Sequence, residues 1–203
     1  AVPAGIYSAV KQYTRSDYAV VTTSFIASSI PSFFLALVLI FIFTVRLGRL
    51  PSSGMRTLGA AQSAGDVIRH MIMPVTTLVA ASTGHILRYI RSAMLEILQA
   101  DYLRTARAKG IGQRRTIMVH ALRNALVPII TVIGMQIPLL FSGAVVVEQV
   151  FSWPGLGLMS MTAILNRDYP VIMGTALMTA VVVVLSNLVT DILYAVVDPT
   201  IKY

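Results

Sequence analysis

The chain has 203 residues, of which 56% are hydrophobic and 12% charged, and its formal net charge at pH 7 is +8. A soluble domain carries about 25% charged residues, so this composition favours a membrane protein. The basic residues do not indicate nucleic-acid binding, because long uncharged stretches separate them. The chain has no cysteine and only three scattered histidines, so it predicts neither a disulfide framework nor a metal site.

The first residues, AVPAGIYSAVKQY, contain no initiator Met, no signal peptide and no complete membrane span. Residues 1–9 are typical of the last turns of a helix that emerges into the cytoplasm. We therefore expect the chain to be truncated at its N-terminus, with at least one further span before Ala1.

Four segments are apolar enough to cross a bilayer, which requires about 20 mostly apolar residues. They cover residues 18–45, 71–90, 124–147 and 169–195. A buried helix of a large soluble core could explain one such segment but not four of them. The sequence predicts an all-α membrane protein, a polytopic helical bundle that forms a single transmembrane domain over residues 1–203.

Lys and Arg are distributed unevenly between the connecting segments, and positive residues are retained on the cytoplasmic side of a membrane. Residues 88–123 hold eight of them, and Lys11, Arg15 and Lys202 lie toward the two ends of the chain. The remaining five lie within residues 46–69 and at Arg167. This distribution places both ends of the chain and the 88–123 segment in the cytoplasm.

The cytoplasmic loop 96–116 contains a short segment with helical spacing of its apolar residues, which predicts an amphipathic helix. Gly110 and Gly112 are expected to end that helix. Small residues on it could dock into a groove of another protein, but anionic lipid heads could equally hold the basic loop. The residues alone leave both interpretations open.

Polar side chains near the expected spans require a protein or water contact, because lipid does not satisfy them. Asn187, Asp191 and Tyr194 share one helical face near the cytoplasmic end of the last span and should face inward. This face could line a translocation path or its inner gate. A hydrogen-bond network between helices, or contact with a partner subunit, is the favoured alternative.

Two acidic residues lie on the expected outer side. Glu148 could meet a transported solute in a translocation path, contact a protein on the outer side, or anchor a helix end in water. Asp168 could contact a protein on the outer side that binds the solute, pair with Arg167, or be solvated. Kinks or close helix packing are expected at Pro31, Gly134, Pro138 and Gly143.

Patterns typical of catalysis are missing from the sequence. There is no G-x-x-x-x-G-K-[ST] phosphate loop, and His70, His85 and His120 lack a paired carboxylate or nucleophile. Neither a cofactor nor an enzymatic activity is predicted. An ion-coupled secondary transporter is one class of membrane protein to consider. It would usually show an inverted repeat, which the sequence lacks.

Several segments resemble the integral membrane subunits of ABC importers, in the branch for dipeptides, oligopeptides and nickel. They are SIPSFFLALVLI at 29–40, RTARAKG at 104–110, HALRNALVPIIT at 120–131, GAVVVEQVFSWPGLG at 143–157, NRDYPV at 166–171 and LVTDILYAVVDPTIKY at 188–203. RTARAKG stands where that family has its EAA loop. Arg104 in place of the Glu and Leu122-Arg123 in place of Leu-Pro resemble the peptide branch.

This resemblance implies the type I permease fold of ABC importers, usually with six spans, of which this chain would hold four. It implies a peptide permease in a bacterial inner membrane, with nickel or another small solute as the alternative substrate. The implied partners are a second homologous permease subunit, two cytoplasmic ABC ATPase subunits, an extracytoplasmic substrate-binding protein and membrane lipid. The residues implied to couple to an ATPase subunit are Tyr102, Arg104, Thr105, Ala106, Arg107, Ala108, Lys109 and Gly110.

Overall fold

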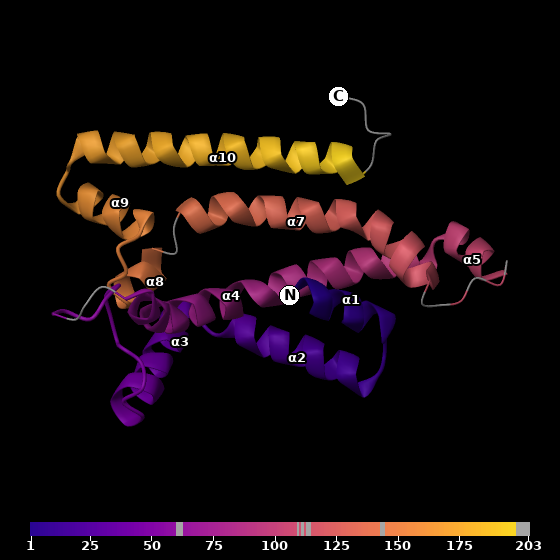
Figure 1. Cartoon of the computed structure of the whole chain (residues 1–203), viewed down its shortest axis with the longest axis horizontal. Coiled ribbons are helices and arrows are strands. Elements are labelled where there is room, and N and C mark those ends of the chain that lie inside the picture. Colours follow the sequence, from indigo (N-terminus) through magenta and orange to yellow (C-terminus); the bar gives the residue numbers. More distant parts are fainter. Residues whose placement is uncertain (60–62, 109, 111, 113–114, 143–144, 198–203) are drawn as a thin grey trace. The chain divides into compact units, whose positions relative to one another are not determined.

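The computed structural model describes residues 1–59, 63–108, 110, 112, 115–142 and 145–197, with the backbone alone at 104, 106–108, 118–120 and 141–142. Every regular element in this described part is a helix (Figure 1). The elements in chain order are α1 (Val2–Val10), α2 (Arg15–Ser29), α3 (Ser32–Leu39), η1 (Ile40–Arg46), α4 (Ala64–Gln99), α5 (Asp101–Ala108), η2 (Thr116–Ala121), α7 (Leu122–Ser142), α8 (Val145–Val150), α9 (Leu156–Leu165) and α10 (Tyr169–Val197).

The helices form two compact units, each made from separate stretches of the chain. The first unit contains residues 1–26, 83–137 and 184–203, and the second contains residues 27–82 and 138–183. Four long helices, α2, α4, α7 and α10, contribute residues to both units.

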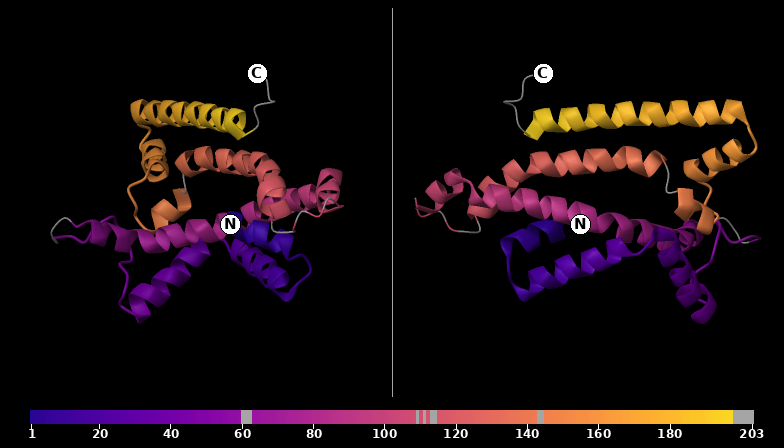
Figure 2. Two further views of the ribbon diagram at one scale, coloured as in Figure 1. Left: turned by 45° about the vertical axis from the view of Figure 1, so that its right-hand side comes forward. Right: turned by 180° about the vertical axis from the view of Figure 1, so that it is seen from behind.

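The core of the first unit lies where α1, the second half of α4, α5 and the start of α7 meet. Its buried side chains are Ala9, Ile90, Met94, Leu103, Ala121, Ala125 and Ile129. Ile90 and Met94 are one helical turn apart, so they project from the same face of α4. Figure 2 shows α1 beside α4 and α5 at the C-terminal end of α4.

The core of the second unit is smaller and joins α3, the first half of α4 and α8. Ala36, Met73, Val147 and Phe151 are its buried members. In the described part of the chain between η1 and α4, Leu50 packs against this core, and the Gly54 N–H donates to the Phe151 carbonyl at 2.8 Å.

By length and composition, two helical segments of the described part can cross a membrane, Leu122–Leu140 and Tyr169–Val197. A third is added if the broken pair α2 and α3–η1 counts as one span. The expected span 71–90 lies inside α4, which at 36 residues is about 54 Å long. Helix α4 is not among the segments that are apolar enough to cross a membrane by this criterion, so its crossing stays a prediction.

The expected span 18–45 is built from two helices rather than one. The break falls at Pro31, whose ψ of 133° is extended rather than helical. Proline disfavours a helical conformation of the residue before it and has no N–H to donate, which explains the break. The expected span 124–147 also differs, because α7 ends at Ser142 and Val145 begins α8. Gly143 lies outside the described residues.

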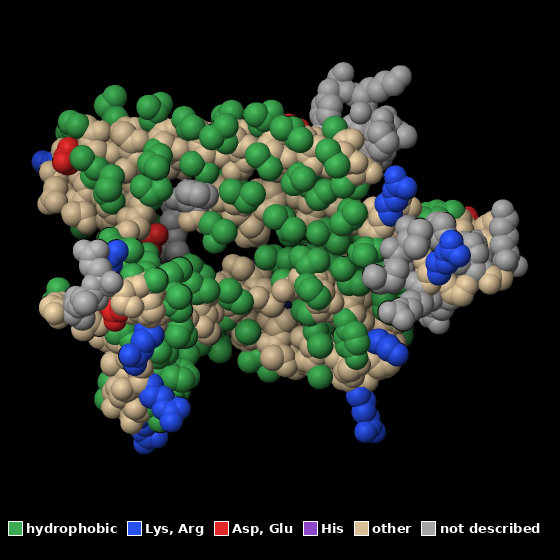
Figure 3. All heavy atoms as spheres, in the orientation of Figure 1, with side chains coloured by type: hydrophobic (Ala, Val, Ile, Leu, Met, Phe, Trp, Pro, Cys, Tyr) green, Lys and Arg blue, Asp and Glu red, His purple; other side chains and the backbone are tan. Residues whose placement is uncertain are grey.

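Helix α10 leaves most of its apolar side chains exposed on the chain (Figure 3). Met173, Leu177 and Val184 are examples. A helix that is apolar on all sides is stable only inside a core, a membrane or an assembly. The exposure of α10 therefore agrees with a membrane protein.

Candidate functional site

The expected coupling loop contains a distinct helix, α5, that begins one residue after α4 ends. At the junction the Ala100 N–H donates to the Ile97 carbonyl at 3.1 Å, and the Leu103 N–H donates to the Ala100 carbonyl at 3.0 Å. Asp101 lies in the first turn of α5, where the positive end of the helix dipole stabilises a carboxylate. The two helices are thus joined by hydrogen-bonded backbone rather than by a long linker.

Leu103 fixes α5 to the first unit. Its side chain is 0% exposed and belongs to the core that contains Ile90 and Met94 of α4 and Ala125 of α7. Full burial of a leucine side chain stabilises its contacts by about 1.5–3 kcal/mol. Leu103 therefore connects α5 to α4 and α7 at once.

A second attachment of α5 is polar and is made by Tyr102, the residue before Leu103. The Asn124 amide donates a hydrogen bond to the Tyr102 hydroxyl at 2.7 Å. Asn124 lies in the first turn of α7, in the segment 120–131 that carries part of the family resemblance. The tyrosine ring itself stays 43% exposed, so it can also contact another protein.

The rest of the expected coupling residues divide into exposed ones and ones whose side chains the structure does not describe. Thr105 is exposed, and its hydroxyl donates to the Asp101 carbonyl at 3.1 Å. Gly110 has a φ of +80°, a left-handed conformation that glycine adopts without strain. Arg104, Ala106, Arg107 and Ala108 lie in α5 with the backbone alone described, and Lys109 lies outside the described residues.

The polar face predicted on α10 is divided by the structure. The Tyr194 hydroxyl donates to the Thr131 hydroxyl of α7 at 2.7 Å, within the first unit. Close packing accompanies this bond, because a Cβ at Gly134 would overlap the Thr190 side chain. Asn187 and Asp191 instead lie on the exposed side of α10.

The Glu148 carboxylate belongs to a local turn of the second unit. It accepts a hydrogen bond from the Leu158 N–H of α9 at 2.7 Å. A Cβ at Gly155 would overlap this carboxylate, and one at Gly157 would lie 3.0 Å from its Oε2 atom. The spacing of Glu148 and the two glycines in GAVVVEQVFSWPGLG therefore has a packing reason.

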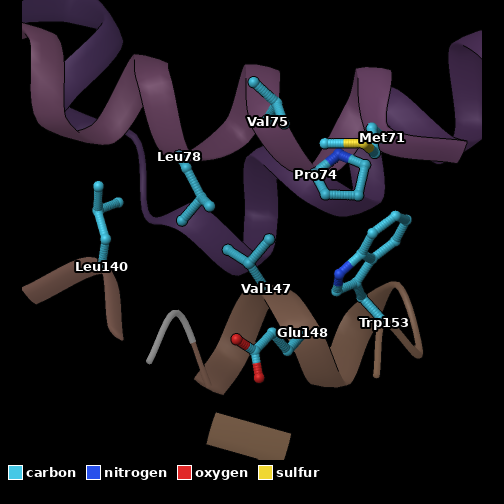
Figure 4. A pocket seen from close by; sticks show the side chains of 8 residues that line it. All are labelled: Met71, Pro74, Val75, Leu78, Leu140, Val147, Glu148 and Trp153. Carbon is cyan, nitrogen blue, oxygen red and sulfur yellow. The ribbon is translucent and has the colours of Figure 1, made fainter. Parts of the chain in front are cut away.

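A cavity of about 150 Å³ lies beside this turn in the second unit (Figure 4). Its lining is mostly apolar and includes Pro74, Leu78 and the Trp153 indole. Glu148 also lines the cavity, and in Figure 4 its carboxylate points away from Pro74. The carboxylate is thus bound to the α9 backbone rather than directed into the cavity.

Asp168 caps the last helix. Its Oδ1 atom accepts a hydrogen bond from the Val171 N–H at 3.3 Å, in the first turn of α10. An N-cap carboxylate of this kind typically contributes about 1 kcal/mol. The side chain is also exposed, so capping leaves it accessible to a partner.

The sequence did not identify Leu103 or Asn124 as site residues. Leu103 carried a signal, because it falls on the apolar face of the predicted amphipathic helix. The pairing of Asn124 with Tyr102 had none, since hydropathy does not report hydrogen bonds between residues 22 positions apart.

Comparison with known proteins gives matches along the whole chain. A family model described as "Binding-protein-dependent transport system inner membrane component" matches residues 1–203. The chain is 47% identical over 202 residues to the oligopeptide transport system permease protein AppB of Bacillus subtilis, covering 100% of this chain and 64% of that protein.

Two further relatives are dipeptide permeases. The di/tripeptide transport system permease protein DppB of Pseudomonas aeruginosa is 42% identical over 218 residues, covering 98% of this chain and 65% of that protein. The dipeptide transport system permease protein DppB of Escherichia coli K12 is 38% identical over 223 residues, covering 100% and 66%. The chain thus spans slightly less than two thirds of the length of these relatives.

Proposed function

The chain belongs to the family of inner membrane components of binding-protein-dependent transport systems, and we propose that it forms part of the membrane pathway of an ATP-driven peptide importer. The substrate class rests on the printed names of its relatives, which are oligopeptide, di/tripeptide and dipeptide permeases. Nickel or another small solute is the alternative that the experiment must test.

The observation that carries the proposal is the attachment of α5. A coupling helix must be held firmly by its own subunit and must also present an accessible surface to its partner. Leu103 and the Asn124–Tyr102 bond supply the first property. The exposed Thr105 and Gly110 agree with the second.

The proposed assembly contains a second homologous permease subunit, two cytoplasmic ABC ATPase subunits and an extracytoplasmic binding protein. Both ends of this chain and α5 then lie in the cytoplasm, as the distribution of Lys and Arg predicts. ATP hydrolysis belongs to the ATPase subunits, and this chain contributes no catalytic residue.

The exposed Asn187 of α10 is proposed to face the translocation path or the second permease subunit, because lipid would not satisfy its amide. Asp191 lies one helical turn further along the same face, and we propose the same surroundings for it. Asp168 is proposed to contact the binding protein while it caps α10. For Glu148 we favour the anchoring role over a place in the path, since its carboxylate is bound to the α9 backbone.

The test is uptake by the full-length protein, assembled with its ATPase and permease partners in proteoliposomes and supplied with its binding protein. We expect ATP-dependent uptake of a labelled dipeptide or oligopeptide and no ATP-dependent uptake of Ni²⁺. Arg107→Glu with Gly110→Asp should reduce co-purification of the ATPase subunits about tenfold, a usual size for coupling between sites.

The matched control is Lys11→Glu, which reverses an exposed positive charge predicted on the same side of the membrane. This variant should keep both ATPase binding and uptake. Uptake that proceeds without ATP would instead indicate an ion-coupled transporter. ATPase binding that survives the α5 double variant would contradict the role of α5.

A further inference from the structure

Three helices of the first unit meet at a buried polar junction, formed by Ser8 of α1, Asp17 of α2 and Arg91 of α4. Arg91 Nη2 donates to Asp17 Oδ2 at 2.9 Å, and Arg91 Nε donates to Asp17 Oδ1 at 3.1 Å. The same Nε also lies 3.1 Å from the Ser8 hydroxyl, which donates in turn to Asp17. We call these three residues the junction.

The junction is largely removed from solvent. Ser8 is 0% exposed, and the side chains of Asp17 and Arg91 are 2% and 25% exposed. Breaking a buried ion pair is costly because it leaves one charge unpaired, whereas removing both charges is often neutral for stability. Such a pair therefore fixes the relative placement of helices more than it adds to stability.

The backbone of the turn between α1 and α2 is also held by Asp17. The Tyr13 N–H donates to Asp17 Oδ2 at 3.0 Å. Tyr13 has a φ of 62°, in the left-handed region that a side chain other than glycine rarely adopts. Asp17 thus sets the geometry of the turn as well as its distance from α4.

Helix α1 lies close against α4 next to the junction. A Cβ at Gly5 would lie 3.0 Å from the Leu87 carbonyl oxygen and 3.0 Å from a methyl group of Ile90. Ala9 joins the same core as Ile90 and Met94. The hairpin of α1 and α2 is therefore attached to α4 by packing on one side and by charge on the other.

Arg91 is connected to α5 through the last turns of α4 and the single residue Ala100. The hydrogen-bonded backbone of α4 runs from Arg91 to Gln99, and α5 begins at Asp101. Leu103 of α5 packs in the same core as Ile90, the residue before Arg91. A displacement of α5 should therefore also displace the part of α4 that carries Arg91.

We propose that Asp17 and Arg91 are positioning residues that make α2, the start of the first expected span, follow α4 when α5 is displaced. This inference rests on the proposed function, because it takes α5 as the helix that an ATPase subunit moves. Core packing alone would let α2 slide against α4, since apolar contacts have no fixed direction. The fork of the Arg91 guanidinium on the carboxylate does have one.

The test uses the full-length protein in its assembled complex and compares four variants with wild type. Asp17→Asn and Arg91→Gln each remove one charge, their combination removes both, and Asp17→Arg with Arg91→Asp exchanges them. The control is Arg15→Gln, which removes an exposed positive charge at the start of α2. Uptake is measured per ATP hydrolysed and per assembled complex.

We expect each single variant to lower uptake per ATP about tenfold, toward the lower end of the usual range for coupling between sites. The double neutral variant should restore the amount of assembled complex but not the uptake per ATP. The exchanged pair should restore part of both, and Arg15→Gln should change neither. A merely structural ion pair predicts instead that the double neutral variant recovers normal uptake per ATP, and that result would overturn the inference.

A second measurement is independent of peptide uptake. These 203 residues contain no cysteine, so Thr22→Cys on the exposed side of α2 gives them a single labelling site, with any cysteine elsewhere in the full-length protein replaced by serine. In wild type the label should change its environment when ATP is trapped in the ATPase subunits, and the double neutral variant should abolish that change. If wild type takes up no peptide but the label responds through the junction, the proposed substrate fails and the inference stands. An equal response in both proteins would overturn it.

Discussion

Asp17 in the first unit and Glu148 in the second are both carboxylates held by the protein, but they hold different kinds of structure. Asp17 binds the guanidinium of Arg91, which is 74 residues away in the chain. Glu148 binds the backbone N–H of Leu158, only 10 residues away. The first carboxylate joins separate helices, and the second closes a turn between consecutive ones.

The difference follows from the partner of each group. A backbone N–H near a carboxylate can find water or a neighbouring carbonyl if the carboxylate is lost. The Arg91 guanidinium is only 25% exposed, so water replaces a lost carboxylate less completely, and it keeps its charge at all accessible pH values. Loss of Asp17 should therefore cost more than loss of any contact in the Glu148 turn.

Asp17→Ala should produce the largest loss of stability, about 3 kcal/mol, at the lower end for a broken buried pair because Arg91 keeps partial access to water. Equilibrium unfolding of the purified protein in detergent micelles measures this loss. Asp168→Ala is the control, since it removes an exposed capping carboxylate and should cost about 1 kcal/mol. Equal losses in the two variants would mean that an ion pair between separate helices contributes no more stability than a cap on one helix.

Leu103→Ala should cost about 2 kcal/mol, because a buried leucine is lost but the short α5 can settle into part of the space. It should also weaken co-purification of the ATPase subunits, since α5 would lose its fixed position. Leu126→Ala is the matched control, as this leucine is 36% exposed on α7. A Leu103 variant that unfolds more easily yet binds ATPase normally would show that α5 needs no rigid attachment.

Gly155→Ala tests the second unit and should cost about 1–2 kcal/mol, because the new Cβ would overlap the Glu148 carboxylate. Gly174→Ala on α10 is the control, since its Cβ would meet nothing within 4 Å. That substitution should be neutral or slightly stabilising in a helix. Unfolding in detergent compares the two, and a harmless Gly155→Ala would mean that the carboxylate can leave the turn easily.

The helices were largely predictable from the sequence, but the behaviour of individual prolines was not. Pro31 ends a helix, while Pro74 lies within the continuous α4. Both remove one backbone donor. In α4 Pro74 is buried and directly follows Met73, a member of the second unit's core, and tertiary packing can override the local preference. Hydrophobic periodicity contains no information about this choice.

The candidate site was predictable in its local part. A glycine at 110 after an amphipathic segment predicts the end of a helix, and the apolar face of that segment includes Leu103. The junction was not predictable, because Asp17 has the same appearance in the sequence as any acid at the end of a span. Only the fold brings Asp17 and Arg91 together, since helical spacing constrains neighbours three or four residues apart.

A third carboxylate, Asp66, extends the comparison to a group that water reaches. The Thr57 N–H and hydroxyl each donate to it at 2.7 Å, and these bonds lower the pKa of Asp66 below its usual value of 3.8, with smaller contributions from His70 and Arg69. A lowered pKa means that the bonds are complete above pH 3.8 and are lost as the pH falls through the lowered value. The effect on overall stability should be the smallest of the series, because water replaces the donors.

Thr57→Val removes only the hydroxyl donor and should move the pKa of Asp66 part of the way back toward 3.8, because the backbone bond remains. A carboxyl carbon NMR titration of the two proteins measures this shift. Thr76→Val is the control, since the Thr76 hydroxyl donates to its own helix at Ile72 and not to Asp66. If Thr57→Val leaves the pKa unchanged, the backbone bond alone holds Asp66, as the Leu158 N–H does for Glu148. If the pKa rises, the side chain shares that role, as the guanidinium does for Asp17.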